Sequence, residues 1–374
     1  MNAVVVSGLW PPDVGGPASH APEVCEWLHL RGHGVTAVTF ADRPPAPQPY
    51  PVHWISRRLP VGVRHAAATA LVARLARRAD VVYSIAILGR TMLATSLSGT
   101  PHVIKVTADP AFERALRWGL TGPDMAAFQQ QRGLRIGALR SMRDLALASA
   151  SRVLFASRAL QELAYSWGLP PEKTQLLPNP IQAPGGLGDP GDLRRRIGLS
   201  GPTLVYAGRL VPQKSVEIAL EAVHRNNEVS LVVAGDGPER ATLERRARDL
   251  GLNGRARFVG PQPRRTVFEL LRGADGAVLS SSWENFPHVA VESLSVGTPV
   301  VATEVGGVGE IVRHDRNGLL VPVGSIDAFG AAIGRYFGEA GLQERLRARA
   351  AESVARFQPQ SIYERLEGLL AGAA

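Results

Sequence analysis

The sequence has little of the chemistry that cross-links a chain or anchors it in a membrane. Its single cysteine, Cys25, excludes an internal disulfide and a zinc site built from several cysteines. No apolar run approaches the roughly 18 residues that a membrane-spanning helix needs. The first residues lead straight into an apolar segment without a basic leader, so we expect no signal peptide. Together these absences predict a cytoplasmic protein.

Patterns that bind metals are also scarce. No two aspartates are separated by a single residue, and the nine histidines show no metal-ligand spacing. We therefore expect neither a bound metal nor a cofactor.

Charge is distributed unevenly along the chain. The formal net charge is +9, and most of the excess lies in residues 1–178. Such asymmetry indicates an anionic partner, for example a membrane surface or a lipid phosphate. Genome composition is the competing explanation, because only three of the 42 basic residues are lysine. Aromatic residues are not interleaved with the basic ones, so we expect no nucleic-acid partner.

The first half of the chain alternates between short apolar segments and longer amphipathic ones. This pattern is typical of βα units around a parallel sheet. Strands are expected at residues 3–7, 35–40, 80–83, 102–106 and 152–156. Helices are expected to end near residue 31 and to cover residues 61–79 and 124–150.

A segment rich in proline and glycine, residues 179–192, predicts a hinge between two domains. A second βα series follows in residues 193–358, with strands expected at 203–207, 229–234, 256–259, 276–280, 299–302 and 319–321. The fold class is therefore α/β, with two doubly wound Rossmann-like domains, 1–178 and 193–358. Residues 360–374 form a helix that we expect to pack back on the first domain. Ligands of such sheets bind outside the carboxyl ends of the strands, which predicts a site in a cleft between the domains.

Two cations follow the first strand of the second domain. Gly208 allows close approach of the backbone, and Arg209 and Lys214 stand near the start of a helix. An arginine fork and a lysine suit a diphosphate. On spacing alone, a pair of solvated surface cations explains them as well.

Two carboxylates, Glu284 and Glu292, lie eight positions apart around a predicted helix start at Pro287. Carboxylates accept hydrogen bonds from vicinal hydroxyl groups, so the pair can bind a hexose and a ribose. Favourable interaction with the helix dipole is the alternative explanation.

Two loops of the first domain are weaker candidates. Gly15 and Gly16 follow the first strand without the spacing of a dinucleotide site, so a tight turn explains them equally. Asp109 and Glu113 follow a later strand and are candidates for contact with sugar or acceptor, but a structural role fits either.

Taken together, the motifs resemble those of the family 4 retaining glycosyltransferases, which have the GT-B fold. The resemblance covers almost the whole chain and is strongest over residues 203–322. Its motifs there are Ala207-Gly208-Arg209-Leu210 with Lys214, Gly235-Asp236-Gly237-Pro238, Phe258-Val259-Gly260, the Glu284/Glu292 pair, Val305-Gly306-Gly307, Glu310 and Asn317-Gly318.

The resemblance implies a hexosyltransferase of glycan or glycoconjugate biosynthesis that uses a UDP- or GDP-sugar without a metal and retains the anomeric configuration. It implies that Arg209 and Lys214 hold the diphosphate, that Glu284 contacts the donor sugar, and that Glu292 binds the ribose. The remaining donor-binding positions that it implies are Gly15, Gly16, Gly208, Val259, Asn285, Phe286, Pro287 and His288.

One departure from the family concerns the first domain. Many members carry a histidine that touches the donor sugar, where this chain has Ala108. The neighbouring Asp109 is the candidate to replace it as a catalytic residue. Two alternative functions share the donor site: a nucleotide-sugar epimerase, and a sugar-nucleotide sensor or scaffold without catalysis.

The acceptor is not specified by any motif. A lipid-linked glycan and a small-molecule natural product both fit a first domain that is basic. The predicted helix at residues 61–79, with Arg64, Arg74, Arg77 and Arg78, is a candidate for peripheral contact with an anionic membrane on its inner face.

Overall fold

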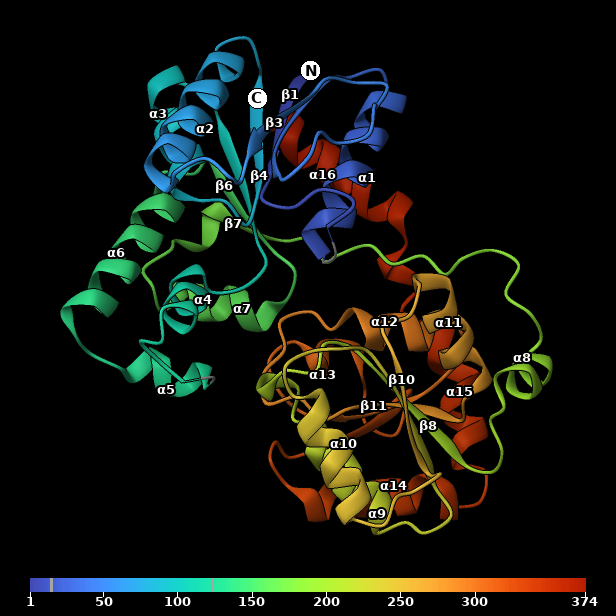
Figure 1. Ribbon diagram of the computed structural model, residues 1–374. Helices are drawn as coiled ribbons and strands as arrows, with labels where there is room; N and C mark the ends of the chain where they lie inside the picture. Colours follow the sequence, from blue (N-terminus) through green and yellow to red (C-terminus); the bar gives the residue numbers. More distant parts are fainter. Residues whose placement is uncertain (14–15, 123) are drawn as a thin grey trace. The chain divides into compact units, whose positions relative to one another are not determined.

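The computed structural model describes residues 1–13, 16–122 and 124–374, and the chain forms two compact units. The first is built from Met1–Gly122, Ala126–Asn179 and the C-terminal Gln360–Ala374, and the second mainly from Pro180–Pro359. Figure 1 shows that each unit is a sheet with helices on both faces. This arrangement is the Rossmann-like architecture that the alternating pattern predicted.

The first unit contains a seven-stranded sheet whose paired strands are all parallel. In order across the sheet, the strands are β3 (Val52–Ser56), β2 (Gly34–Ala41), β1 (Asn2–Ser7), β4 (Val81–Ile85), β5 (His102–Val106), β6 (Arg152–Phe155) and β7 (Thr174–Leu176). The central strands β4 and β5 are buried along their whole length. Most of their residues are apolar, as burial on both faces favours, and Ser84, His102 and Lys105 are the polar residues among them.

Helices cover both faces of this sheet. The helices in this part of the chain are α1 (Gly16–Leu30), α2 (Val61–Ala76), α3 (Gly89–Ser98), α4 (Pro110–Arg117), α5 (Met125–Gln130), α6 (Leu134–Ala148), α7 (Arg158–Tyr165), η1 (Pro171–Lys173) and the C-terminal α16 (Pro359–Ala371). Helices α1 and α16 bury their apolar side chains against one face. Helices α2 and α3 pack together against the other face.

The C-terminal helix α16 is fixed to α1 by polar contacts as well as by apolar packing. The Tyr363 hydroxyl donates to Glu23 Oε2 over 2.6 Å. Glu367 accepts from the Trp27 indole over 3.2 Å and lies 2.8 Å from His33 Nε2. The last residues of the chain are therefore part of the first unit.

The second unit has a six-stranded parallel sheet. Its strands, in spatial order, are β10 (Ala256–Gly260), β9 (Ser230–Ala234), β8 (Thr203–Ala207), β11 (Gly276–Leu279), β12 (Val300–Thr303) and β13 (Gly318–Val321). Its helices are α8 (Pro190–Ile197), η2 (Pro212–Lys214), α9 (Val216–His224), α10 (Arg240–Asp249), α11 (Arg264–Gly273), α12 (His288–Ser295), α13 (Val308–Ile311), α14 (Ile326–Gly338), α15 (Leu342–Ser353) and η3 (Ala355–Phe357).

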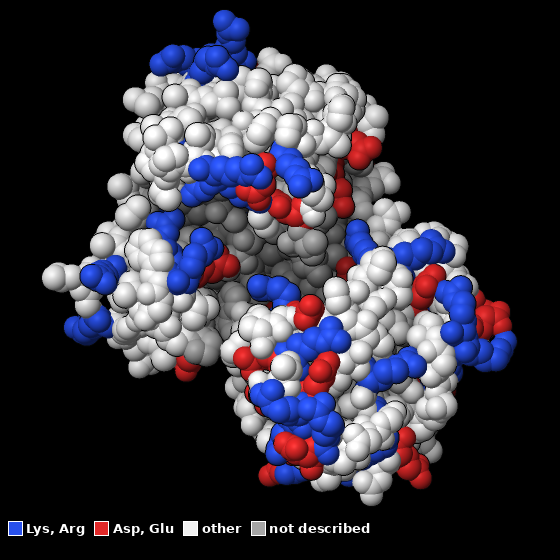
Figure 2. All heavy atoms as spheres, viewed as in Figure 1, with Lys and Arg blue, Asp and Glu red and all other residues white. Residues whose placement is uncertain are grey.

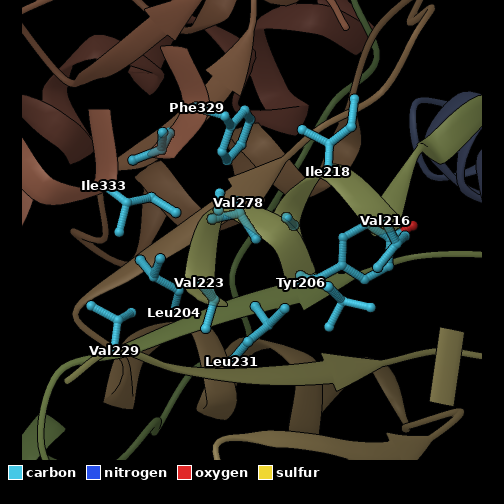
Figure 3. Close-up of a cluster of buried hydrophobic side chains, with 14 of the residues drawn as sticks. Leu204, Tyr206, Val216, Ile218, Val223, Val229, Leu231, Val278, Phe329 and Ile333 are labelled. Atoms are coloured by element: carbon cyan, nitrogen blue, oxygen red, sulfur yellow. The ribbon is translucent and has the colours of Figure 1, made fainter. Parts of the chain in front are cut away.

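Figure 3 shows the apolar core of this unit, where α9 and α14 pack on the sheet. Leu204 and Tyr206 of β8 point to this face together with Leu231 of β9, as the two-residue period of a strand requires. Phe329 and Ile333, one turn apart on α14, complete the layer from the helix side.

The structure differs from the predicted elements in one helix and at both edges of the first sheet. The single helix predicted for residues 124–150 is wrong, because α5 and α6 are separated at Gly133, which has φ of 139°. Strands β3 and β7, which lie at the two edges of the sheet, were not predicted. In β3, His53 is partly buried and Trp54 is exposed, and β7 has only three residues, so neither strand has the apolar signal of a fully buried strand.

Strand order reverses once in each sheet, between β1 and β4 in the first unit and between β8 and β11 in the second. Ligands of open parallel sheets bind outside the carboxyl ends of the strands at such a reversal. The loops that follow β1, β4, β8 and β11 are therefore the places where functional residues are expected.

Candidate functional site

An ion pair lies at the strand-order reversal of the second unit. Lys214, at the end of η2, follows β8, and Glu284 follows β11. Lys214 Nζ lies 2.5 Å from Glu284 Oε1, and the two side chains are 17% and 7% exposed. The sequence pattern proposed both residues as site residues, and the fold brings them into direct contact.

Ser281 orients the same carboxylate. Its hydroxyl donates to Glu284 Oε1 over 2.6 Å, so this oxygen accepts from both Ser281 and Lys214. In the described parts of the chain, no hydrogen bond reaches the other oxygen, Oε2. Oε2 is therefore the atom left to accept a hydrogen bond from a substrate hydroxyl.

Further hydrogen bonds join the loop after β8 to the loop after β11. The Ser282 amide donates to the Gln213 carbonyl over 2.9 Å, and Gln213 Nε2 donates to the Trp283 carbonyl over 2.8 Å. The Ser280 hydroxyl donates to the Lys214 carbonyl over 3.1 Å. These contacts fix the backbone on both sides of the ion pair, so that its geometry exists before a ligand binds.

Glycine makes this close packing of the loops possible. A Cβ on Gly306, where φ is 51°, would lie 1.9 Å from the Glu284 carbonyl oxygen. A Cβ on Gly235 would lie 1.8 Å from the Gly208 carbonyl oxygen. Both contacts are shorter than any non-bonded approach that a side chain tolerates, so glycine is required at the two positions.

Arg209 lies beside this pair in sequence and is exposed. Its carbonyl accepts a 2.8 Å hydrogen bond from the Tyr206 hydroxyl, whose pKa is raised by burial, so the hydroxyl stays a donor. Among the described residues, no carboxylate forms an ion pair with the Arg209 guanidinium. The loop thus offers one exposed guanidinium and one lysine held on a carboxylate.

Glu292 lies on α12, in the second turn after Pro287, which caps the helix. Burial raises the pKa of its carboxyl, and Arg264 acts in the opposite direction, with Nε 3.7 Å from Oε1. The side chain is 15% exposed, so it is largely shielded from solvent but still accessible to a ligand.

The other donor-binding positions predicted in the second unit lie on adjoining loops. Asn285 and Phe286 are buried, and the Phe286 ring makes edge contacts with His288 and Phe357 at 5.9 and 5.2 Å between centroids. Val259, at the end of β10, accepts a 2.6 Å hydrogen bond from Gln262 through its carbonyl oxygen.

Asp109 is completely buried in the first unit. Oδ1 caps α4 by accepting from the amides of Ala111 and Phe112 at 2.9 and 3.4 Å. Oδ2 accepts from Gln129 at 3.0 Å and from the guanidinium of Arg143 at 2.9 Å. These four bonds explain Asp109 as a structural residue, and its catalytic role stays a prediction.

Of the two glycines predicted in the first unit, Gly16 begins α1, and Gly15 lies outside the described residues.

Sequence reasoning missed three side chains of the site: Ser281, Gln213 and Arg264. The serine precedes Glu284 by three residues, within the motif that was recognised. Gln213 immediately precedes Lys214, so its position was a usable signal. Arg264 gave none, because its partner Glu292 lies on a different helix.

Two families match most of the chain. The family described as "Glycosyl transferases group 1" matches residues 194–353, and the "Glycosyl transferase 4-like domain" matches residues 15–180. The two matches meet near the boundary between the structural units.

Two curated relatives align with part of the chain. The "Lipopolysaccharide core biosynthesis glycosyltransferase LpsE" of Rhizobium meliloti is 38% identical over 171 residues, which are 46% of this chain and 50% of the relative. A "D-inositol 3-phosphate glycosyltransferase" of Acidothermus cellulolyticus is 31% identical over 227 residues, 56% of this chain and 50% of the relative. The matched part thus spans half the length of these relatives.

A solved structure matches over the full length. The Anabaena protein Alr3699/HepE, crystallised in complex with UDP, superimposes with a TM-score of 0.80 over 100% of both chains at 20% identity. This likeness confirms the two-domain Rossmann-like fold.

Two kinds of feature are absent from the described part of the chain. None of its helices is long and apolar enough to cross a membrane. No three His, Cys, Asp or Glu side chains within it are grouped so that they could hold a metal ion.

Proposed function

Because the chain belongs to the group 1 glycosyltransferases with a family-4-like first domain, we propose that it transfers a hexose or hexosamine from a UDP- or GDP-sugar to a hydroxyl acceptor. The observation that carries the proposal is the Lys214–Glu284 ion pair at the reversal between β8 and β11. It sets a cation for a diphosphate beside a carboxylate for a sugar hydroxyl. HepE, which shares the fold, was crystallised with UDP.

The proposed chemistry breaks the bond between the anomeric carbon and the β-phosphate oxygen of the donor. Negative charge develops on the departing nucleoside diphosphate, and Arg209 and Lys214 stabilise it. Fixed groups that meet developing charge are often the largest single contribution to catalysis. Lys214 is suited to this role because Glu284 and the hydrogen-bonded loops already hold it in place.

The two carboxylates bind hydroxyl groups of the donor in this proposal. Oε2 of Glu284 accepts from a hydroxyl of the transferred sugar, while Oε1 stays bonded to Lys214 and Ser281. Glu292 accepts from the ribose hydroxyls at the start of α12. The aromatic contacts of Phe286 fix the loop between the two carboxylates.

We propose that the acceptor hydroxyl attacks from the face that the diphosphate leaves, and passes its proton to the departing phosphate oxygen. This route needs no protein nucleophile and no metal, and it retains the anomeric configuration. Proton NMR of the product tests it through the anomeric coupling constant, and an inverted anomer would contradict it.

Nucleotide binding is the first test of the donor site. We expect one of UDP, GDP, ADP and dTDP to raise the melting temperature of the full chain. A ligand at 100 times its Kd stabilises the folded state by about 2.7 kcal/mol. Arg209→Ala should abolish the response, whereas Arg248→Ala, an exposed arginine at the end of α10, should keep it.

The donor site would be overturned if none of the four nucleotides raised the melting temperature, or if Arg209→Ala and the wild type responded equally. A nucleotide response together with acceptor-dependent release of nucleoside diphosphate would distinguish the transferase from an epimerase and from a sensor.

For the acceptor, the proposal includes both a lipid-linked glycan and a small molecule. The name of one curated relative mentions lipopolysaccharide core, and the name of the other mentions D-inositol 3-phosphate. Peripheral membrane contact through α2 belongs to the same proposal. Arg74, in the last turn of α2, is exposed, as are Arg77 and Arg78 just beyond it. Co-sedimentation with vesicles tests this contact, and equal binding to neutral and anionic vesicles would exclude it.

A further inference from the structure

The strand-order reversal of the first unit has a distinctive loop structure. The loop after β1 lies against the loop after β4, since a Cβ on Gly8 would lie 3.6 Å from Ile87 Cδ1. Ala86, immediately after β4, has φ of 57°, a left-handed conformation that non-glycine residues seldom adopt. Strained backbone of this kind concentrates at functional sites. This edge is therefore a candidate for ligand binding in the first unit.

Three arginines reach this edge from three helices. Arg64 is in the first turn of α2 after β3, Arg90 is in the first turn of α3 after β4, and Arg114 is on α4 after β5. In a parallel βα unit, each helix begins at the carboxyl end of the preceding strand. The Arg90 guanidinium lies 4.6 Å from the centre of the Phe40 ring at the end of β2. Arg64 Nη1 donates to the Arg57 carbonyl over 2.9 Å.

Helices α2 and α3, which carry Arg64 and Arg90, pack against each other. Burial lowers the pKa of Arg90, and the charges of Arg64 and Arg114 lower it further. Burial also lowers the pKa of His65, and all three arginines act in the same direction. This shared effect supports the grouping of Arg114 with the arginines of α2 and α3.

No counter-charge accompanies this gathering in the described parts of the chain. Arg64, Arg90 and Arg114 form no ion pair there, whereas the adjacent Arg57 is bonded to Asp13, with Nη1 3.0 Å from Oδ1. On the face seen in Figure 2, several basic side chains of the first unit have no acidic neighbour, while the two signs are interspersed over the second unit. A cluster of like charges without counter-ions favours an anionic ligand.

We propose that Arg64, Arg90 and Arg114 form a subsite for a phosphate group carried by the acceptor. The inference rests on the proposed function, in which the donor binds to the second unit. It adds that the first unit binds the acceptor and that the acceptor carries a phosphate. Guanidinium forks match the geometry of phosphate oxygens and remain charged at any physiological pH. The phosphate can belong to a soluble phosphorylated acceptor or to a lipid-linked one, since both present the same group.

Calorimetric titration of the full chain with glycerol 3-phosphate and with inorganic phosphate, at low ionic strength, tests the subsite. We expect the wild type to bind glycerol 3-phosphate. Arg64→Gln and Arg114→Gln should each weaken binding by about tenfold, the usual value of one charge-assisted hydrogen bond. Arg114 is exposed, so its variant should fold normally. The matched control is Arg135→Gln, an exposed arginine on α6, which should bind like the wild type.

A second arm distinguishes the sources of the phosphate. Vesicles of phosphatidylcholine, with and without phosphatidylglycerol, are sedimented with the same proteins. Binding to the anionic vesicles that is lost in Arg64→Gln and Arg114→Gln indicates a lipid phosphate. Binding of glycerol 3-phosphate alone indicates a soluble acceptor.

The subsite is overturned if neither probe binds, or if the cluster variants and Arg135→Gln bind equally well. Each protein is also titrated with the nucleotide that raises the melting temperature of the wild type. This titration distinguishes failure of the subsite from failure of the proposed function. Nucleotide binding that persists while phosphate binding is absent would refute only the subsite. Absence of nucleotide binding in the wild type would refute the donor site, whatever the phosphate result.

Discussion

The two units have the same kind of parallel sheet with one reversal of strand order, but they place positive charge there differently. In the second unit, Lys214 is held on Glu284 by loops that hydrogen-bond to each other. In the first unit, Arg64, Arg90 and Arg114 come from three helices and have no acidic partner among the described residues. A cation that is held in one position is suited to stabilise the negative charge that develops when a bond breaks at a fixed place. Unpaired arginines suit recognition of a ligand that brings its own negative charge.

The largest effect is expected from the buried ion pair of the first unit. Arg143 and Asp109 are 3% and 0% exposed, so Arg143→Met leaves a buried carboxylate without its partner. Loss of one member of such a pair costs about 3–5 kcal/mol in the free energy of unfolding. Urea denaturation followed by tryptophan fluorescence measures it, because Trp167 lies 3.8 Å from the Arg143 guanidinium.

The exposed Arg135 on the same helix provides the control, and Arg135→Met should change stability by less than about 0.5 kcal/mol. Nucleotide binding by the second unit should survive in both variants. Equal stability of the two variants would show that the pair contributes nothing to the first unit.

A pH-dependent effect is expected from Lys105, which is fully buried in β5 and donates to the Leu177 carbonyl. Burial, with a smaller contribution from Arg365, lowers the pKa of its amine to about 7. Between pH 7 and the usual lysine pKa near 10.4, the unfolded chain binds a proton that the folded chain does not, so stability rises with pH.

Below pH 7 both states are protonated and the full penalty of the buried charge is present. Between pH 7 and pH 10, the free energy of unfolding of the wild type should therefore rise by about 4 kcal/mol relative to that of Lys105→Met. This is about 1.4 kcal/mol for each pH unit. Denaturation across this range measures it, with Lys173→Met as the partly exposed control. Parallel curves for Lys105→Met and the wild type would contradict the buried-amine account.

Lys214→Met should slow release of nucleoside diphosphate from the donor by about 100-fold or more, as when a fixed group that meets developing charge is removed. Lys173→Met, in the first unit, should retain full activity. A loss shared equally by both variants would mean that the charge of Lys214 has no specific role.

The smallest effect is expected from Ser281→Ala, which removes one of the two hydrogen bonds to Glu284 Oε1. A bond of this kind to a charged group is worth about 1.5 kcal/mol, or roughly tenfold in kcat/KM. Ser295→Ala on α12, whose hydroxyl donates to the Glu292 carbonyl within its own helix, should behave like the wild type. An unchanged kcat/KM in Ser281→Ala would show that Lys214 alone orients the carboxylate.

Sequence patterns predicted the second unit better than the first, for physical reasons. Five of the six strands there are mostly buried and apolar, and Lys214 and Glu284 belong to short motifs that follow two of them. The arginine cluster of the first unit has no such signal, because its members are far apart in sequence and meet only through the topology of the sheet. Of the three, only Arg64 was named in advance, for its place on a basic helix.

Individual side-chain roles were harder to predict than elements. Asp109 follows a strand as a catalytic residue would, yet its environment is that of a helix cap and a buried ion pair. Whether an aspartate at this position is structural or catalytic depends on its neighbours Gln129 and Arg143, which lie on α5 and α6. Contacts between distant helices are not encoded in any local motif.

The central claim is that the reversal between β8 and β11 holds a diphosphate through Arg209 and Lys214. The most direct test uses the nucleoside diphosphate that raises the melting temperature of the full chain. Calorimetry compares the affinity for this diphosphate with the affinity for the nucleoside that has the same base. We predict an advantage of at least about 100-fold for the diphosphate, which decreases by about tenfold or more in Arg209→Ala and in Lys214→Met. An advantage that is absent from the wild type, or unchanged in both variants, would contradict the account.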